Sequence, residues 1–217
     1  MKSKDKRTGI FPVDIKTGAK LTSQALAFDV VGRNAILRDP HYGGGQYYGG
    51  KPGPDVGLAI ARMIGHITYL SDHAMASKFG RDLRSGSFEQ GDEEHVEFQV
   101  QSYLRYQGSQ FSSSFDANTY MLMTRALDYF DLAREYDNDP VAAFRHASCS
   151  FLVISFSTDW RFSPERSREI VNALVEAGRP VSYAEIDANE GHDAFLLPIP
   201  RYMDIFSAYM RRVGEQD

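Results

Sequence analysis

Two short apolar runs with one helical segment between them constrain the fold of this chain more than any other feature. Residues 151–156 (FLVISF) are almost wholly apolar, and residues 180–186 (PVSYAEI) form a similar run, as buried parallel strands do. Between them, Ser163 followed by proline favours the start of a helix, and Gly178 favours its end. Since parallel strands need a crossover of this kind, the sequence predicts a strand–helix–strand unit.

The chain before residue 150 carries helical patterns instead of strands. Apolar residues recur at helical spacing over residues 21–38, from Asp55 to about residue 75, over 94–107 and over 117–135. The predicted buried stripe of the last segment consists of Tyr120, Met123, Leu127 and Phe130. One more helix is expected at about 199–213. The pattern as a whole predicts an α/β protein with a large helical region before its strands.

The change of pattern near residue 150 divides the chain into three predicted parts. Residues 1–20 are expected to be a loosely ordered lead-in, residues 21–147 a helical region, and residues 148–217 an α/β unit. Because sheets usually contain about four to six strands, two strands are expected to form only part of a sheet.

Composition argues against several classes of function. The net charge of −5 argues against general nucleic-acid binding, which usually needs a basic surface. No apolar run approaches the roughly 20 residues that cross a bilayer, and the basic first residues lack the apolar core of a secretory signal. We therefore expect a cytoplasmic protein that binds neither nucleic acid nor membrane. The single cysteine, Cys149, excludes an internal disulfide, and its apolar surroundings predict a buried, unreactive thiol.

Polar residues suited to acid–base chemistry follow both predicted strands. Asp159 comes just after the first strand, and Gly191-His192 comes after the second, 33 positions later. The carboxyl ends of parallel strands, where open α/β sheets place their sites, lie about 4.8 Å apart. An aspartate that accepts from imidazole Nδ1–H fixes the tautomer and stabilises the imidazolium. Asp159 and His192 are therefore predicted to pair, although a lone Asp and a lone His on loops are more often solvated surface residues.

Long segments of the sequence resemble the homoserine O-acetyltransferases, which are acyltransferases of methionine biosynthesis with the α/β-hydrolase fold. Residues 151–198, from FLVISFSTDW to EGHDAFLLP, are similar to the C-terminal part of that family. The segments SQALAFDVVGRNAIL, ARMIGHITYLSDHAMASKFGRDL and SYLRYQGSQFSSSFDANTYMLMTRALDYFD are similar to its helical lid. The resemblance implies a partial α/β-hydrolase fold with a helical lid domain.

The resemblance also assigns roles to individual residues. His192 would be the general base and acid, Asp159 its orienting carboxylate, and Asp193 the contact to the homoserine amine. Arg62 and Tyr69, seven positions apart and so on one helix face, would hold the substrate carboxylate and line the pocket, whereas His66 would be structural. From the helix alone, a surface arginine and a core tyrosine would be the simpler interpretation. The implied substrates are L-homoserine and an acyl-CoA, without a metal or further cofactor, and the implied assembly is a homodimer through the lid helices.

A credible nucleophile does not emerge from the sequence. The triad of this fold runs serine, acid, histidine, with the serine in a G-x-S-x-G-type elbow. The serines considered lack a preceding strand or flanking glycines, or lie on the acid's own strand: Ser87, Ser112, Ser113, Ser114, Ser155 and Ser157. We therefore expect the C-terminal portion of such an enzyme, inactive alone, with the nucleophile on a missing N-terminal half.

Other interpretations stay open at this point. A non-catalytic truncated paralogue could act as a dimerisation module, and a general hydrolase would share the Asp–His pair but would not explain the lid segments. The sequence decides neither acetyl against succinyl donors nor homoserine against serine as acceptor. The acid loop, DWRFSPERS, departs from the family pattern, which usually has an apolar residue in place of Arg161 and proline in place of Ser163.

Overall fold

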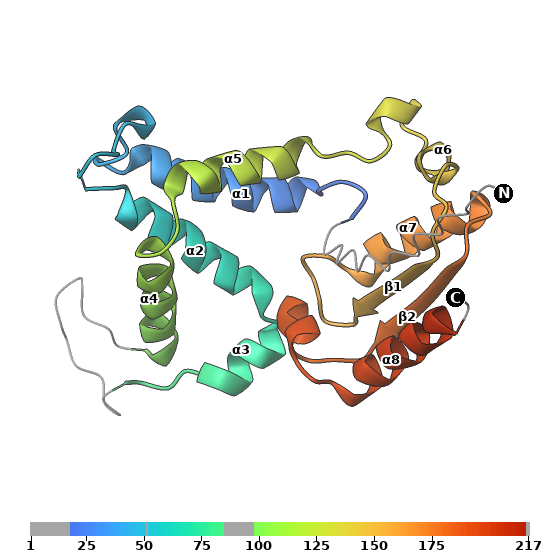
Figure 1. The fold of residues 1–217 in the computed structure, drawn as a ribbon. Coiled ribbons are helices and arrows are strands. Elements are labelled where there is room, and N and C mark those ends of the chain that lie inside the picture. Colours follow the sequence, from blue (N-terminus) through green and yellow to red (C-terminus); the bar gives the residue numbers. More distant parts are fainter. Residues whose placement is uncertain (1–17, 51, 85–97, 216–217) are drawn as a thin grey trace.

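The structure is a computed structural model that describes residues 18–50, 52–84 and 98–215. The predicted lead-in, apart from residues 18–20, lies outside the described residues. Two parts of the molecule lie side by side, one helical and one α/β (Figure 1). The helical part contains α1 (Ser23–Arg38), η1 (Gly43–Gly45), α2 (Asp55–Tyr69), α3 (Asp72–Phe79), α4 (Gln99–Ser112) and α5 (Ala117–Tyr129). The chain then passes through η2 (Arg134–Tyr136) to α6 (Pro140–Phe144), which packs against α7 (Pro164–Glu176) of the α/β part.

The α/β part is the predicted strand–helix–strand unit followed by one more helix. Its elements are β1 (Phe151–Phe156), α7 (Pro164–Glu176), β2 (Val181–Ile186), η3 (Gly191–Leu196) and α8 (Pro200–Gly214). The two strands are parallel, in a register that runs from Phe151 opposite Val181 to Phe156 opposite Ile186. Helices α7 and α8 flank the strands (Figure 1). The predicted α/β class is confirmed, and the sheet is small.

The core of the α/β part lies at the carboxyl ends of the strands. Phe156 and Ile186, the last residues of β1 and β2, are buried with Ala188 and Ala194. Tyr202 of α8 packs edge-on against Phe156, with ring centroids 5.5 Å apart. Because these residues anchor the ends of both strands, the loops that follow the strands start from fixed positions.

The helical part is built around α2, which packs against both α1 and α4. Its core contains Ile36 of α1, Leu58 and Ala61 of α2, and Met121 of α5. Close packing of α1 on α2 depends on Gly57, since a Cβ there would lie only 2.7 Å from the Cα of Ile36. A small residue is therefore required where the two helices meet.

The sequence placed some helix ends well and some buried faces wrongly. Helix α1 begins after Thr22, whose side chain caps the helix by accepting from the Ala25 amide. The single helix predicted from Asp55 to about residue 75 is instead two helices, because the chain is extended at Leu70 and Ser71 caps α3.

The predicted stripe on α5 is wrong except at Tyr120, which is partly buried and packs against the helical core. Met123 is 55% exposed and Leu127 42% exposed, while Met121 is buried in the helical core. The buried side of α5 carries Ala117, Met121 and Thr124, so the helix is rotated relative to the prediction. Cys149 is exposed, which corrects the predicted buried thiol.

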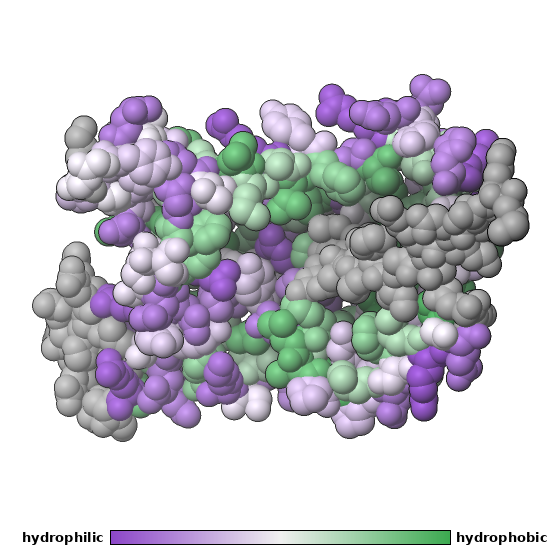
Figure 2. Space-filling view, in the orientation of Figure 1, coloured by the Kyte–Doolittle hydropathy of each residue, from purple (hydrophilic) through white to green (hydrophobic). Residues whose placement is uncertain are grey.

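Apolar side chains remain on the outside of the helical part. Hydrophobic surface is visible over α1 and α5 in the upper part of the space-filling view (Figure 2). The exposed side chains on these two helices are Val30, Val31, Leu37, Leu122, Met123, Leu127 and Tyr129. Within the described residues, no helix has the length and apolar character needed to span a membrane.

Candidate active site

The loops that follow β1 and β2 are tied to each other by hydrogen bonds. Thr158, after β1, donates through Oγ1 to the carbonyl of Ala188 at 2.6 Å and accepts from the Gly191 amide at 3.1 Å. Ser157 donates through Oγ to Asp187 Oδ1 at 2.9 Å. The adjacent strand ends therefore hold the Asp159 loop and the His192 loop against each other, as the sequence interpretation required.

Asp159 is oriented from two directions. Its Oδ1 accepts from the backbone amides of Arg161 at 3.1 Å and Phe162 at 2.9 Å. Its Oδ2 lies 2.8 Å from Nδ1 of His192. An ionised carboxylate can only accept, so Nδ1 carries the proton in this contact and Nε2 is the nitrogen available for proton exchange. The side chains of Asp159 and His192 are 8% and 12% exposed, so the pair is shielded from bulk water.

Aromatic side chains from three segments surround the His192 imidazole. Ring centroids lie 4.9 Å away for Phe162, 5.7 Å for Tyr69 and 5.7 Å for Phe195. Tyr69 comes from α2, so the helical part reaches the histidine directly. Low-polarity walls strengthen electrostatic interactions inside a site, including that of Asp159 with a protonated His192.

The structure brings the other predicted site residues to the same region. The Arg62 guanidinium lies over the ring of Tyr69 at 5.6 Å and over the ring of Phe111 at 4.7 Å. Asp193 follows His192 in η3. Arg62 contacts Tyr69, Tyr69 contacts His192, and Asp193 is the next residue after His192, so the predicted set lies in one region of the molecule.

Tyr103 of α4 is a neighbour of this set that the sequence did not single out. The pKa of Tyr103 is raised, first by burial and next by the negative charge of Asp193, while Arg62 acts in the opposite direction. Its hydroxyl lies 2.9 Å from Nδ1 of His66. Burial, with smaller contributions from Arg62 and Lys78, lowers the pKa of His66 to about 4. His66 is therefore neutral near pH 7 and supports Tyr103, consistent with a structural role.

Among the serines considered as nucleophiles, those that the structure describes are held in hydrogen bonds, and none gains support for that role. Ser155 Oγ lies 2.8 Å from the hydroxyl of Tyr183, and Ser157 is held in the loop contact described above. Ser112, Ser113 and Ser114 each donate to a backbone carbonyl of α4. Ser87 lies outside the described residues.

Comparison with known proteins gives strong sequence relatives. The chain is 61% identical over 202 residues to a homoserine O-succinyltransferase of Saccharophagus degradans, covering 93% of this chain and 53% of that protein. It is 60% identical over 203 residues to the homoserine O-succinyltransferase of Cellvibrio japonicus, covering 94% and 53%. These relatives support the assignment of the chain to the homoserine acyltransferase family. The chain spans about half the length of the curated relatives it matches, and no family model matches it.

Solved structures agree on the fold. The homoserine O-acetyltransferase of Bacillus anthracis superposes with a TM-score of 0.71 at 20% identity, over 82% of this chain and 47% of that chain. Esterase E22 gives a TM-score of 0.71 at 16% identity, over 91% and 51%. Likeness at such low identity shows the fold alone, and it is that of part of an α/β-hydrolase.

Proposed function

We propose that this chain forms part of a homoserine O-acyltransferase that transfers an acyl group from acyl-CoA to the γ-hydroxyl of L-homoserine, in methionine biosynthesis. The observation that carries the proposal is the shielded Asp159–His192 hydrogen bond at 2.8 Å, in a chain about 60% identical to homoserine O-succinyltransferases. The names of those relatives favour succinyl-CoA over acetyl-CoA as the donor. We place the enzyme in the cytoplasm.

The proposed reaction proceeds through an acyl-serine, with the serine supplied from outside the residues of this sequence. His192 Nε2 takes the serine proton as the oxygen attacks the thioester carbonyl, and it returns that proton to the departing CoA thiolate. In the second half, Nε2 takes the proton of the homoserine γ-hydroxyl, which attacks the acyl-serine. The proton then goes to the serine oxygen as O-acyl-homoserine leaves. Asp159 stabilises the imidazolium in both halves.

The amino-acid end of homoserine is assigned to the charged residues around the histidine. Arg62 suits the substrate carboxylate, because a guanidinium can donate two parallel hydrogen bonds to it. Asp193, directly after His192, would accept from the substrate amine. Tyr69 would form the pocket wall between Arg62 and His192, since its ring contacts both.

The test reconstitutes the enzyme and measures CoA release. The chain is mixed with a separately produced fragment of the Saccharophagus degradans relative, namely the part of that protein outside the matched region. Acetyl-CoA or succinyl-CoA is then supplied with homoserine, with serine, or with neither. We expect homoserine-dependent release that is faster with succinyl-CoA. His192→Ala should lower the rate by about 10⁶-fold and Asp159→Asn by about 10⁴-fold, while His146→Ala, at an exposed histidine, should not change it. A folded complex that releases no CoA would contradict the proposal.

A second candidate function rests on the apolar surface of α1 and α5. Exposed side chains such as Val31, Leu122 and Tyr129 are those expected at a subunit interface, which supports a homodimer through the helical part. By itself, the chain could then act as a non-catalytic dimerisation module. Size-exclusion chromatography with light scattering distinguishes the possibilities, because a monomer with no affinity for a full-length relative would argue against this role.

A further inference from the structure

We propose that Arg161 is a positioning residue for the Asp159–His192 pair, which it connects to the helical part of the molecule. The inference rests on the proposed function only in giving that pair a catalytic task. It goes further because it assigns a role to the residue at which the acid loop departs from the family that the sequence resembles.

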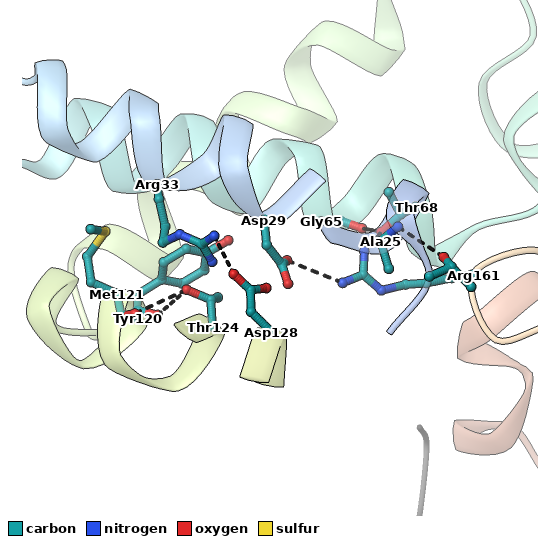
Figure 3. A network of polar contacts seen from close by, with 11 residues as sticks. Ala25, Asp29, Arg33, Gly65, Thr68, Tyr120, Met121, Thr124, Asp128 and Arg161 are labelled. Atoms are coloured by element: carbon teal, nitrogen blue, oxygen red, sulfur yellow. Dashed lines mark hydrogen bonds and ion pairs between the residues drawn. The ribbon is translucent and has the colours of Figure 1, made fainter. Parts of the chain in front are cut away.

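One residue makes both halves of this connection. The backbone amide of Arg161 donates to Oδ1 of Asp159 at 3.1 Å, which helps to leave Oδ2 for His192. Its guanidinium donates through one nitrogen to Oγ1 of Thr68 at 3.0 Å and pairs through the other with Oδ1 of Asp29 at 3.6 Å. Thr68 is at the end of α2 and Asp29 is in the middle of α1, so the side chain spans two helices (Figure 3).

The anchor of Arg161 is a network of four charged side chains, each between 7% and 15% exposed. Asp29 lies next to an ion pair between Arg33 of α1 and Asp128 of α5. Burial raises the pKa of Asp29, and the negative charge of Asp128 adds to this, while Arg161 is the largest influence that lowers it. With Arg161 present, two positive charges balance two negative ones. Without it, Asp29 would lose its ion-pair partner beside the like charge of Asp128, so the network holds Arg161 in place.

Other contacts at the end of α2 hold the same two loops. Trp160 donates through Nε1 to the carbonyl of Leu70 at 3.2 Å, and Ser71 donates through Oγ to the carbonyl of Asn189. These contacts fix the loops as a whole. Arg161 differs from them because its own amide contacts the catalytic carboxylate, so a shift of its side chain moves a hydrogen-bond donor of Asp159.

Three variants separate positioning from stability. Arg161→Met removes the connection and leaves Asp29 as an uncompensated buried charge, which usually costs a fold heavily. The double variant Arg161→Met with Asp29→Asn removes that charge as well, so the remaining Arg33–Asp128 pair is balanced. Arg161→Lys keeps a positive charge that can reach Asp29. If Arg161 only stabilises the fold, the double variant should behave as the original chain does at His192.

The readout is the tautomer of His192 by ¹⁵N NMR of the 217-residue chain at about pH 8.5, above the usual range of histidine titration. A carboxylate at Nδ1 holds the Nδ1–H form, whereas a free imidazole favours Nε2–H. We expect Nδ1–H to dominate in the original chain and Nε2–H to become the larger population in the double variant. Arg161→Lys should retain most of the Nδ1–H signal of the original chain. Exposed His146 provides the control signal, which should not change.

The result that overturns the proposal is a folded double variant whose His192 keeps the original share of Nδ1–H. In the reconstituted enzyme, we also expect the double variant to lose about 10²-fold in kcat with little change in KM for homoserine, because misplacing a catalytic group by about 1 Å has a cost of that order. If the original chain releases no CoA, the proposed function fails while the tautomer result still decides the role of Arg161.

Discussion

Replacing Gly191 by alanine tests how closely the His192 loop approaches the helical part. Gly191 has φ of +73°, and a Cβ at this position would lie 2.8 Å from the carbonyl oxygen of Tyr69 and 2.8 Å from the carbonyl carbon of Leu70. It would also clash with the backbone nitrogen of Ser71. These atoms belong to the backbone and cannot rotate away, so the added methyl group must push the histidine loop off the end of α2.

The expected loss in the free energy of unfolding has two sources. A left-handed backbone costs an alanine about 1–2 kcal/mol, and overpacking a close contact usually costs about 1–3 kcal/mol. Together they predict that Gly191→Ala lowers the free energy of unfolding by about 2–5 kcal/mol. Because the displaced loop carries His192, CoA release in the reconstituted enzyme should fall as well.

Two other glycines provide matched controls for the two sources. Gly178 has φ of +67° with nothing within 4 Å of its Cβ position, so Gly178→Ala should lose only about 1–2 kcal/mol. Gly57 is crowded by α1 but has helical geometry, so Gly57→Ala should lose about 1–3 kcal/mol from crowding, offset by about 1 kcal/mol of helix propensity. Urea unfolding followed by circular dichroism gives all three values. Equal losses for Gly191→Ala and Gly178→Ala would refute the close approach.

Three more predictions concern groups away from this contact. His66 has a folded-state pKa of about 4, below its unfolded value of about 6.5, so its contribution to stability is full above pH 6.5 and is lost as pH falls toward 4. The urea concentration at the midpoint of unfolding should therefore fall between pH 6.5 and 4, and it should fall less in His66→Gln. Exposed Cys149 should react with a thiol reagent in the folded chain within a few-fold of its rate in urea, and strong protection would contradict its exposure. Arg33→Met should lower the unfolding free energy by about 3–5 kcal/mol because it leaves Asp128 unpaired, and adding Asp128→Leu should recover most of that loss.

The residues near the sheet could be predicted because their relation is local in topology. Asp159 and His192 each follow a strand, and neighbouring parallel strands bring their carboxyl ends together whatever the rest of the chain does. The structure places the two side chains in contact. Their catalytic roles, and those of Arg62, Tyr69 and Asp193, stay predictions, since contact alone assigns no reaction.

The residues that join the two parts of the molecule could not be predicted in the same way. Arg161 meets Thr68 from 93 positions away, and Ser71 meets Asn189 from 118, distances over which periodicity carries no information. The break after Tyr69 was missed because apolar spacing continues through it, although Ser71 followed by Asp72 is an ordinary helix start. The face of α5 was misjudged because apolar residues surround that helix, so spacing alone does not show which of them is buried.

These contacts also bear on how the proposed enzyme is assembled. Asp159 receives three hydrogen bonds from this chain, from the amides of Arg161 and Phe162 and from His192. The loops that carry the pair are held to the end of α2 by Thr68 and to the residues that lead into α3 by Leu70 and Ser71. In the proposed enzyme, Asp159 and His192 would thus be oriented before a nucleophile arrives, and the segment outside this sequence would supply the serine and the donors that stabilise the oxyanion. Preorganisation of this kind supports reconstitution from two pieces as an experiment.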